Sequence, residues 1–169
     1  MNMSELLKKL ETYADSDYLP MHMPGHKRRM GDLGNPFFID ITEIDGFDDL
    51  HHAEGILKQA EERAAELYGS EETHYLVNGS TSGILAAISG CTAAGGTVLL
   101  ARNSHKSAYH AVLLRGLHVH YIYPQPAGKM GINGPVTAEN VDRLLEEHPE
   151  TKMVYITSPT YDGVVSDVE

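Results

Sequence analysis

The stretch His74-Tyr75-Leu76-Val77-Asn78-Gly79-Ser80-Thr81-Ser82-Gly83 decides the fold that this sequence predicts. Its first residues are apolar and favour a strand, whereas the residues that follow Gly83 are small or aliphatic and have helical spacing. The pattern therefore predicts a strand, a tight turn and a helix. The first N–H groups of such a helix lack partners within it and lie at the positive end of its dipole, which favours a bound anion.

Residues 79–83 are accordingly interpreted as a phosphate-binding turn, in which the hydroxyl groups of Ser80, Thr81 and Ser82 add hydrogen-bond donors. A structural alternative is that Ser80 only caps the helix, and the local pattern leaves both interpretations open. The turn is not a P-loop, because Ile84 follows Gly83 where a Walker motif has lysine.

Further strands and helices follow this turn along the chain. The run from Thr97 to Ala101 is continuously apolar, as is typical of a strand buried on both faces, and short strands are also expected at 119–123 and 153–156. Helices are expected between these strands, one of them capped by Thr137. The alternation predicts an α/β fold with a mostly parallel sheet flanked by helices.

Three polar loops follow strand ends, at residues 78–83, 102–107 and 157–163. Ligands of open parallel sheets gather at the carboxyl ends of the strands, so we expect these loops to converge on one crevice. The imidazole of His105 could stack on an aromatic ring or act as an acid or base, or it could simply be exposed to water. Lys106 is a less favoured candidate for a Schiff-base lysine, because it stands at the start of a helix.

The N-terminal third of the chain has a different character. A short amphipathic helix is expected at 4–14 and a second helix at 53–68, ended by Gly69. The segment between them lacks sustained periodicity, which indicates a functional or disordered segment. The predicted division of the chain is therefore into residues 1–52 and residues 53–169.

Carboxylates and imidazoles crowd residues 43–52, but their spacing matches no zinc or calcium pattern, so a solvated acidic loop is preferred and no metal ligand is predicted. The net charge of −11 argues against a nucleic-acid partner. The sequence has no apolar run of transmembrane length and no signal peptide, so we expect a cytoplasmic protein without a membrane partner. Cys91, the single cysteine, is expected in the core.

Five motifs resemble, in the same order, the arginine/lysine/ornithine decarboxylase family of fold-type-I pyridoxal-phosphate enzymes. They are His22-Met23-Pro24-Gly25-His26-Lys27; Asp40-Ile41-Thr42-Glu43 with Gly46-Phe47-Asp48-Asp49-Leu50-His51; Leu76-Val77-Asn78-Gly79-Ser80-Thr81-Ser82-Gly83; Arg102-Asn103-Ser104-His105-Lys106-Ser107; and Ile156-Thr157-Ser158-Pro159-Thr160-Tyr161-Asp162-Gly163. The resemblance begins near residue 18 and reaches the last residue. It implies that residues 53–169 are the N-terminal part of an incomplete, cofactor-binding large domain of the aspartate-aminotransferase type. Residues 1–52 would then contain the N-terminal helix and an extended active-site or interface segment.

The resemblance also implies a set of site residues. Pyridoxal 5'-phosphate would be held through its phosphate and ring, with His105 stacked on the ring as the catalytic residue; the cofactor-binding set is Gly79, Ser80, Thr81, Ser82, His105 and Thr160. A second set would lie near the substrate entrance or a subunit boundary: His22, Pro24, Gly25, His26, Lys27 and Tyr161. The implied reaction is decarboxylation of arginine, lysine or ornithine to a polyamine or its precursor.

In the resembling family, the Schiff-base lysine and the aspartate that pairs with the pyridine nitrogen lie beyond the position that matches Glu169. The chain is therefore expected to be an N-terminal fragment that is inactive alone and that forms a homodimer or larger homo-oligomer to cover its open edges. Two alternatives remain: a non-catalytic phosphate-binding or decoy module, and another fold-type-I enzyme such as an aminotransferase or lyase.

Overall fold

The computed structural model describes residues 5–19, 34 and 40–168 of the 169-residue chain. The chain divides into two compact units, residues 1–63 and 64–169. The predicted division at residue 52 concerns the roles of the two parts and stays a prediction. None of the helices in the described ranges combines the length and the apolar character needed to cross a lipid bilayer.

The first unit contains α1 (Glu5–Ala14), the short 3-10 helix η2 (Leu50–His52) and the beginning of α2 (Ile56–Tyr68). Both predicted helices are confirmed, although α2 begins three residues later than expected. It ends at Gly69, which has a φ of 66° and donates its N–H to the carbonyl of Glu66. Glycine adopts this left-handed conformation without steric cost, which explains why the helix stops there.

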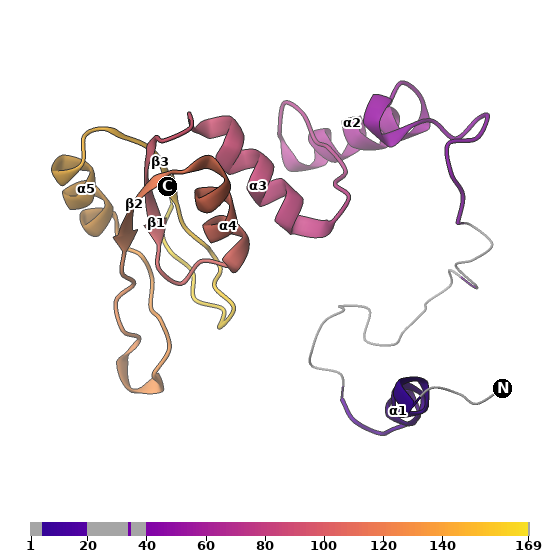
Figure 1. Cartoon of the computed structure of the whole chain (residues 1–169), viewed down its shortest axis with the longest axis horizontal. Coiled ribbons are helices and arrows are strands. Elements are labelled where there is room, and N and C mark those ends of the chain that lie inside the picture. Colours follow the sequence, from indigo (N-terminus) through magenta and orange to yellow (C-terminus); the bar gives the residue numbers. More distant parts are fainter. Residues whose placement is uncertain (1–4, 20–33, 35–39, 169) are drawn as a thin grey trace. The chain divides into compact units, whose positions relative to one another are not determined.

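The second unit is built on a three-stranded parallel sheet with the order β2-β1-β3 (Figure 1). The strands are β1 (Thr97–Ala101), β2 (His118–Ile122) and β3 (Thr151–Tyr155), which confirms the three strands expected in this region to within two residues at each end. The connection between β2 and the helix that precedes β3 contains the short 3-10 helix η3 (Gly128–Met130).

Two helical layers cover the two faces of this sheet. Val98 and Leu100 of β1 pack in one cluster with residues of α3 (Gly79–Cys91) and α4 (Lys106–Arg115), whereas Leu99 and Ala101 pack with residues of α5 (Ala138–Glu147) on the opposite face. Figure 1 shows α5 on one side of the strands and α4 on the other. All five residues of β1 are buried, so the predicted doubly buried strand and the α/β fold with a parallel, helix-flanked sheet are confirmed.

Two expectations for this unit are wrong. Residues 74–77 form no strand, and Tyr75, Leu76 and Val77 are 46, 53 and 49% exposed. Residues that favour a strand form one only when a neighbouring strand accepts their backbone hydrogen bonds, and none does so within the described part of the chain. Cys91 is exposed rather than in the core, because it lies at the last turn of α3, beyond the part of the helix that packs on the sheet.

Candidate functional site

The start of α3 is open. Its N-cap is Asn78, which has a φ of 63° and makes no capping hydrogen bond through its side chain. The interpretation of Ser80 as the cap is therefore wrong, since Ser80 lies inside the first turn of the helix. The N–H groups of this first turn have no partner within the helix and point outward, where they can donate to an anion.

The three hydroxyl groups of this turn differ in their hydrogen bonding. Ser82 donates back to the carbonyl oxygens of Val77 and Gly79, with an oxygen-to-oxygen distance of 2.9 Å for the second. Ser80 and Thr81 are exposed, and their hydroxyls have no hydrogen-bond partner among residues 40–168. Two hydroxyls therefore remain available beside the open helix start, while the third holds the turn in shape.

His105 closes the start of α4. Its Nδ1 accepts a hydrogen bond from the backbone N–H of Ser107 at 3.2 Å and lies 2.8 Å from the Ser107 hydroxyl. Because a backbone N–H can only donate, the neutral imidazole carries its proton on Nε2. Ser107 is 1% exposed, whereas His105 itself is exposed, so a buried serine fixes the orientation of a ring that faces outward.

Thr160 lies in the loop that follows β3. Its hydroxyl accepts from the N–H of Val164 at 3.1 Å, and its own N–H donates to the carbonyl of Val164 at 2.8 Å. Both contacts close a turn that carries Tyr161 at its tip, fully exposed. The side chain of Thr160 thus shapes this loop, and its O–H remains free to donate.

The topology brings two of these segments, the loops with His105 and Thr160, to one edge of the sheet; the expected convergence of the start of α3 with them stays a prediction. Because β1 and β3 are neighbouring parallel strands, the loops that begin at Arg102 and Ile156 leave the same edge. Helices α3 and α4 pack against each other, and the guanidinium of Arg115 at the end of α4 donates to the carbonyl of Thr92 just after α3, at 2.8 Å. The C-terminal ends of the two helices therefore meet. No hydrogen bond joins the three segments within residues 40–168.

The loop after β1 contains features that sequence reasoning missed. Arg102 donates to the Tyr109 hydroxyl at 2.9 Å, and its guanidinium lies 5.5 Å from the ring centroids of both Tyr109 and Tyr121. Next to it, the amide oxygen of Asn103 and the hydroxyl of Ser104 are buried without a hydrogen-bond partner among the described residues. Buried polar atoms without partners are rare, so this loop has unused capacity for a polar ligand.

These observations test whether the second unit fits a phosphate-bearing cofactor. An uncapped helix start, two unpartnered hydroxyls, a fixed imidazole and orphaned polar atoms in the loop beside it are what an anionic aromatic group requires. The residues present therefore fit pyridoxal phosphate. Asn78 and Ser107, which shape the starts of α3 and α4, were given no role of their own in the sequence analysis. The signals that could have found them are local: an Asn before Gly79, and a hydroxyl two residues after His105.

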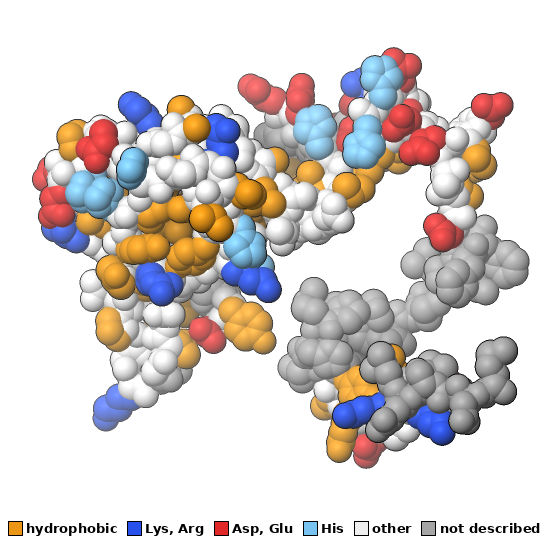
Figure 2. Space-filling model, in the orientation of Figure 1, with side chains coloured by type: hydrophobic (Ala, Val, Ile, Leu, Met, Phe, Trp, Pro, Cys, Tyr) orange, Lys and Arg blue, Asp and Glu red, His pale blue; other side chains and the backbone are white. Residues whose placement is uncertain are grey.

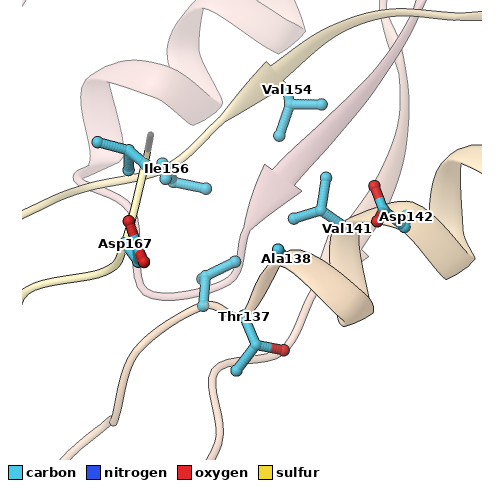
Figure 3. A pocket seen from close by; sticks show the side chains of 9 residues that line it. Thr137, Ala138, Val141, Asp142, Val154, Ile156 and Asp167 are labelled. Atoms are coloured by element: carbon cyan, nitrogen blue, oxygen red, sulfur yellow. The ribbon is translucent and has the colours of Figure 1, made fainter.

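A separate hollow of about 320 Å³ lies on the α5 face of the sheet (Figure 3). Thr137, Ala138 and Val141 from the start of α5 face Val154 and Ile156 across it. Its lining is mainly apolar and includes none of the predicted site residues, so it is distinct from the open start of α3.

The first unit contributes less to the predicted site. His22, Pro24, Gly25, His26 and Lys27 lie outside the described residues, and their assignment to the substrate entrance or an interface stays a prediction.

Asp48 is a carboxylate of this unit that accepts several backbone hydrogen bonds. It accepts hydrogen bonds from the backbone N–H groups of Glu54, Gly55, Asp49 and Leu57, at 3.1, 2.8, 3.0 and 3.0 Å. The bond from Glu54 is the largest of the effects that hold the pKa of the Asp48 carboxyl well below its usual range, and partial desolvation opposes them. This carboxylate is therefore committed to holding its own loop and the start of α2.

Comparison with known proteins identifies the family. Residues 4–169 match the family model described as "Orn/Lys/Arg decarboxylase, major domain". The chain belongs to this family. It is 33% identical over 168 residues to an arginine decarboxylase of Bacillus subtilis (strain 168), covering 95% of this chain and 34% of that protein. It is also 38% identical over 175 residues to the uncharacterized protein YaaO of the same organism, covering 96% of this chain and 35% of that protein.

A solved structure supports the same assignment. Lysine decarboxylase A from Pseudomonas aeruginosa is 26% identical, with a TM-score of 0.59 and coverage of 90% of this chain and 24% of that one. The resemblance noted from the five motifs is thereby confirmed, as is membership of a family of basic amino-acid decarboxylases. The chain spans about a third of the length of the first two of these relatives.

Proposed function

We propose that this chain forms the phosphate-binding side of the cofactor site in a pyridoxal-phosphate-dependent decarboxylase of basic amino acids. The observation that carries this proposal is the open start of α3, where Ser80 and Thr81 stand beside N–H groups that no side chain caps. Family membership supports the decarboxylase class, since relatives are named arginine, lysine and ornithine decarboxylases.

Each predicted residue has a task in this proposal. The hydroxyls of Ser80 and Thr81 and the N–H groups from Gly79 onward bind the phosphate, while Ser82 holds the turn that presents them. His105 stacks on the pyridine ring, kept in orientation by Ser107. Thr160 donates from the neighbouring loop. Bound pyridoxal phosphate supplies an electron sink for the carbanion left when carbon dioxide departs.

Substrate and assembly belong to the same proposal. Arginine, lysine and ornithine are the substrates of the named relatives, and loss of their carboxyl group would give a polyamine or its precursor. We further propose a cytoplasmic homo-oligomer in which residues 22–27 and Tyr161 lie at the substrate entrance. Catalysis itself is proposed for a polypeptide of the relatives' length.

The cofactor test uses 4-deoxypyridoxine 5'-phosphate, an analogue that lacks the aldehyde and so cannot attach to surface lysines. Isothermal titration of the chain should show one binding event. A Ser80→Ala/Thr81→Val double variant should bind about 100-fold more weakly, since two hydrogen bonds to a charged group are lost. The matched control is Ser89→Ala, near the other end of the same helix, which should bind like the parent chain. Equal binding by all three proteins contradicts the proposal.

The decarboxylase assignment is tested by grafting. This chain replaces the matching third of the Bacillus subtilis arginine decarboxylase, and release of labelled carbon dioxide from arginine, lysine and ornithine is measured. Activity of the graft that falls with the double variant, but not with Ser89→Ala, supports a cofactor site that works in catalysis. A folded graft that binds the analogue and releases no carbon dioxide favours the non-catalytic binding module instead.

A further inference from the structure

A second group of ligating side chains lies away from the open start of α3. His120 of β2, His148 at the end of α5 and Glu150 just before β3 each offer one atom, and these atoms all lie within 4.8 Å of one another. Glu150 Oε1 is 3.9 Å from His120 Nε2 and 3.7 Å from His148 Nδ1. Figure 2 shows histidine and acidic side chains side by side in the region of α5.

The donor types are those of a transition-metal site. Two imidazole nitrogens and one carboxylate oxygen form a common set of three protein ligands for Zn²⁺, with a water in the fourth position. Zinc–ligand bonds of about 2.0–2.2 Å place neighbouring ligand atoms of a tetrahedron about 3.3 Å apart. The two separations from Glu150 Oε1, 3.9 and 3.7 Å, therefore need to shorten by about half an ångström. The ligand atoms of the cluster as a whole lie within 4.8 Å of one another, so the two imidazole nitrogens approach one another by up to about 1.5 Å when the ion binds.

Three features of the surroundings favour binding of a cation by this cluster. His148 is the C-cap of α5, and its N–H donates to the carbonyl of Leu144, so the group stands at the negative end of a ten-residue helix. The side chains of His148 and His120 are 26 and 36% exposed, which leaves an ion accessible yet partly shielded from water. The chain has 24 acidic residues against 13 lysines and arginines, so its overall field also attracts cations.

The two rings are stacked, with centroids 3.3 Å apart and planes 15° from parallel. Lone pairs of an imidazole lie in the ring plane, so two parallel rings cannot both point at one ion. One ring must turn out of the stack when metal binds. His120 is the more exposed of the pair and stands on an edge strand of the sheet, so this side chain has the freedom to turn.

We propose that His120, His148 and Glu150 form a Zn²⁺-binding site that ties the edge strand β2 to the connection between α5 and β3. None of these residues belongs to the predicted cofactor site. The site is a structural clamp with a solvent-facing fourth position. It requires no decarboxylase activity, and its presence can be measured on the chain as it stands.

The test is a titration of the metal-stripped chain with Zn²⁺, monitored by isothermal calorimetry. We expect one ion per chain with micromolar affinity, and a melting temperature higher by about 5–10 °C at an excess of 100 times the dissociation constant. His120→Gln and His148→Gln should each weaken binding at least tenfold. The matched control is His118→Gln, two residues earlier on the same strand and outside the cluster, which should bind like the parent chain.

Co²⁺ supplies a second readout that does not depend on stability. A visible absorption band typical of four- or five-coordinate cobalt should appear in the parent chain and in the His118→Gln variant, and should be absent from the two ligand variants. Circular dichroism confirms that each variant is folded before titration. The proposal is overturned if one equivalent of Zn²⁺ is not bound at 100 µM, or if His118→Gln loses as much affinity as His120→Gln.

Discussion

The start of α2 is capped by a side chain, whereas the start of α3 is open. At α2 the chain supplies its own anion, because the Asp48 carboxylate accepts from the N–H groups of Gly55 and Leu57 at 2.8 and 3.0 Å. At α3 no side chain among the described residues takes this place, although Ser80 and Thr81 offer hydroxyls beside it. One helix start thus holds a built-in carboxylate, and the other presents the same kind of donors to an anion from outside.

The starts of α4 and α5, the other α-helices that begin in the second unit, are capped by side chains. Thr137 caps α5 by accepting from the N–H of Asn140, and His105 caps α4 by accepting from Ser107. An uncapped start costs a helix stability that a serine, threonine or aspartate in the N-cap position would provide. The start of α3 lacks this contribution, and the following variants test the difference between open and capped starts.

The largest effect is expected when a carboxylate side chain is introduced at the start of α3. Ser80→Asp places a carboxylate in the first turn, where it interacts favourably with the helix dipole by about 0.3–1 kcal/mol. We expect a melting temperature higher by about 1–3 °C and an affinity for 4-deoxypyridoxine 5'-phosphate lower by about 100-fold, because the new charge repels the phosphate and one donor is lost. Differential scanning fluorimetry and calorimetric titration measure the two effects.

Ser89→Asp controls for the added charge, since it lies near the far end of the same helix. It should leave analogue binding within about twofold of the parent chain, because nine residues of helix, about 13 Å, separate the new charge from the phosphate, and a separation longer than the Debye length of about 10 Å weakens the interaction. If Ser80→Asp binds the analogue as tightly as the parent, the start of α3 is not the phosphate site.

The second-largest effect is expected at the start of α2, which Asp48 caps. Asp48→Asn keeps the shape of the side chain and the left-handed backbone conformation, which asparagine tolerates. It removes the negative charge that accepts hydrogen bonds from four backbone N–H groups. We expect hydrogen exchange at the amides of Glu54, Gly55 and Leu57 to become about tenfold faster, as measured by NMR. Asp45→Asn, in the same loop, is the control and should leave these amides unchanged.

The pH dependence of this loop follows from the lowered pKa of Asp48. The carboxyl of the unfolded chain titrates near pH 3.9, so the stabilisation by the charged form is complete above about pH 5. It is lost as the pH falls through the unfolded value toward the lower folded pKa. Protection of the Gly55 amide should decline over this acid range in the parent chain and stay flat in Asp48→Asn. A parallel decline in both proteins would contradict the assignment.

Local patterns in the sequence predicted the elements that local forces determine. The bounds of β1, the cap at Thr137 and the stop at Gly69 were all foreseen, because apolar periodicity and cap chemistry act over a few residues. The family assignment succeeded for a different reason: five motifs in a fixed order are specific even though each one is short.

Failures and omissions concern interactions between distant residues. The strand expected at 74–77 needs a partner strand, which a local pattern does not reveal. The four N–H groups that converge on Asp48, and the meeting of His120 with His148 and Glu150, depend on how loops and strands pack. A motif search by spacing therefore overlooked both groups. The roles of Ser80, His105 and Thr160 stay predictions until binding is measured.

A moderate effect is expected when the capping oxygen at the start of α5 is removed. Thr137→Val keeps the side-chain volume of Thr137 and removes the oxygen that accepts from Asn140. The free energy of unfolding should fall by about 1 kcal/mol, measured by urea denaturation. Thr137→Ser keeps the oxygen and should lie within about 0.5 kcal/mol of the parent chain. If the two variants are equally stable, this cap does not stabilise α5.

The smallest effect is expected at the N-cap of α3. Asn78 makes no capping bond through its side chain, so its contribution lies in tolerating a φ of 63°. Asn78→Gly should therefore change the free energy of unfolding by no more than about 0.5 kcal/mol, because glycine adopts this conformation freely. Asn78→Ala should lower it by about 1–2 kcal/mol through left-handed strain alone. Equal losses in both variants would show that the side chain does cap α3, and the start of this helix would then be closed like the others.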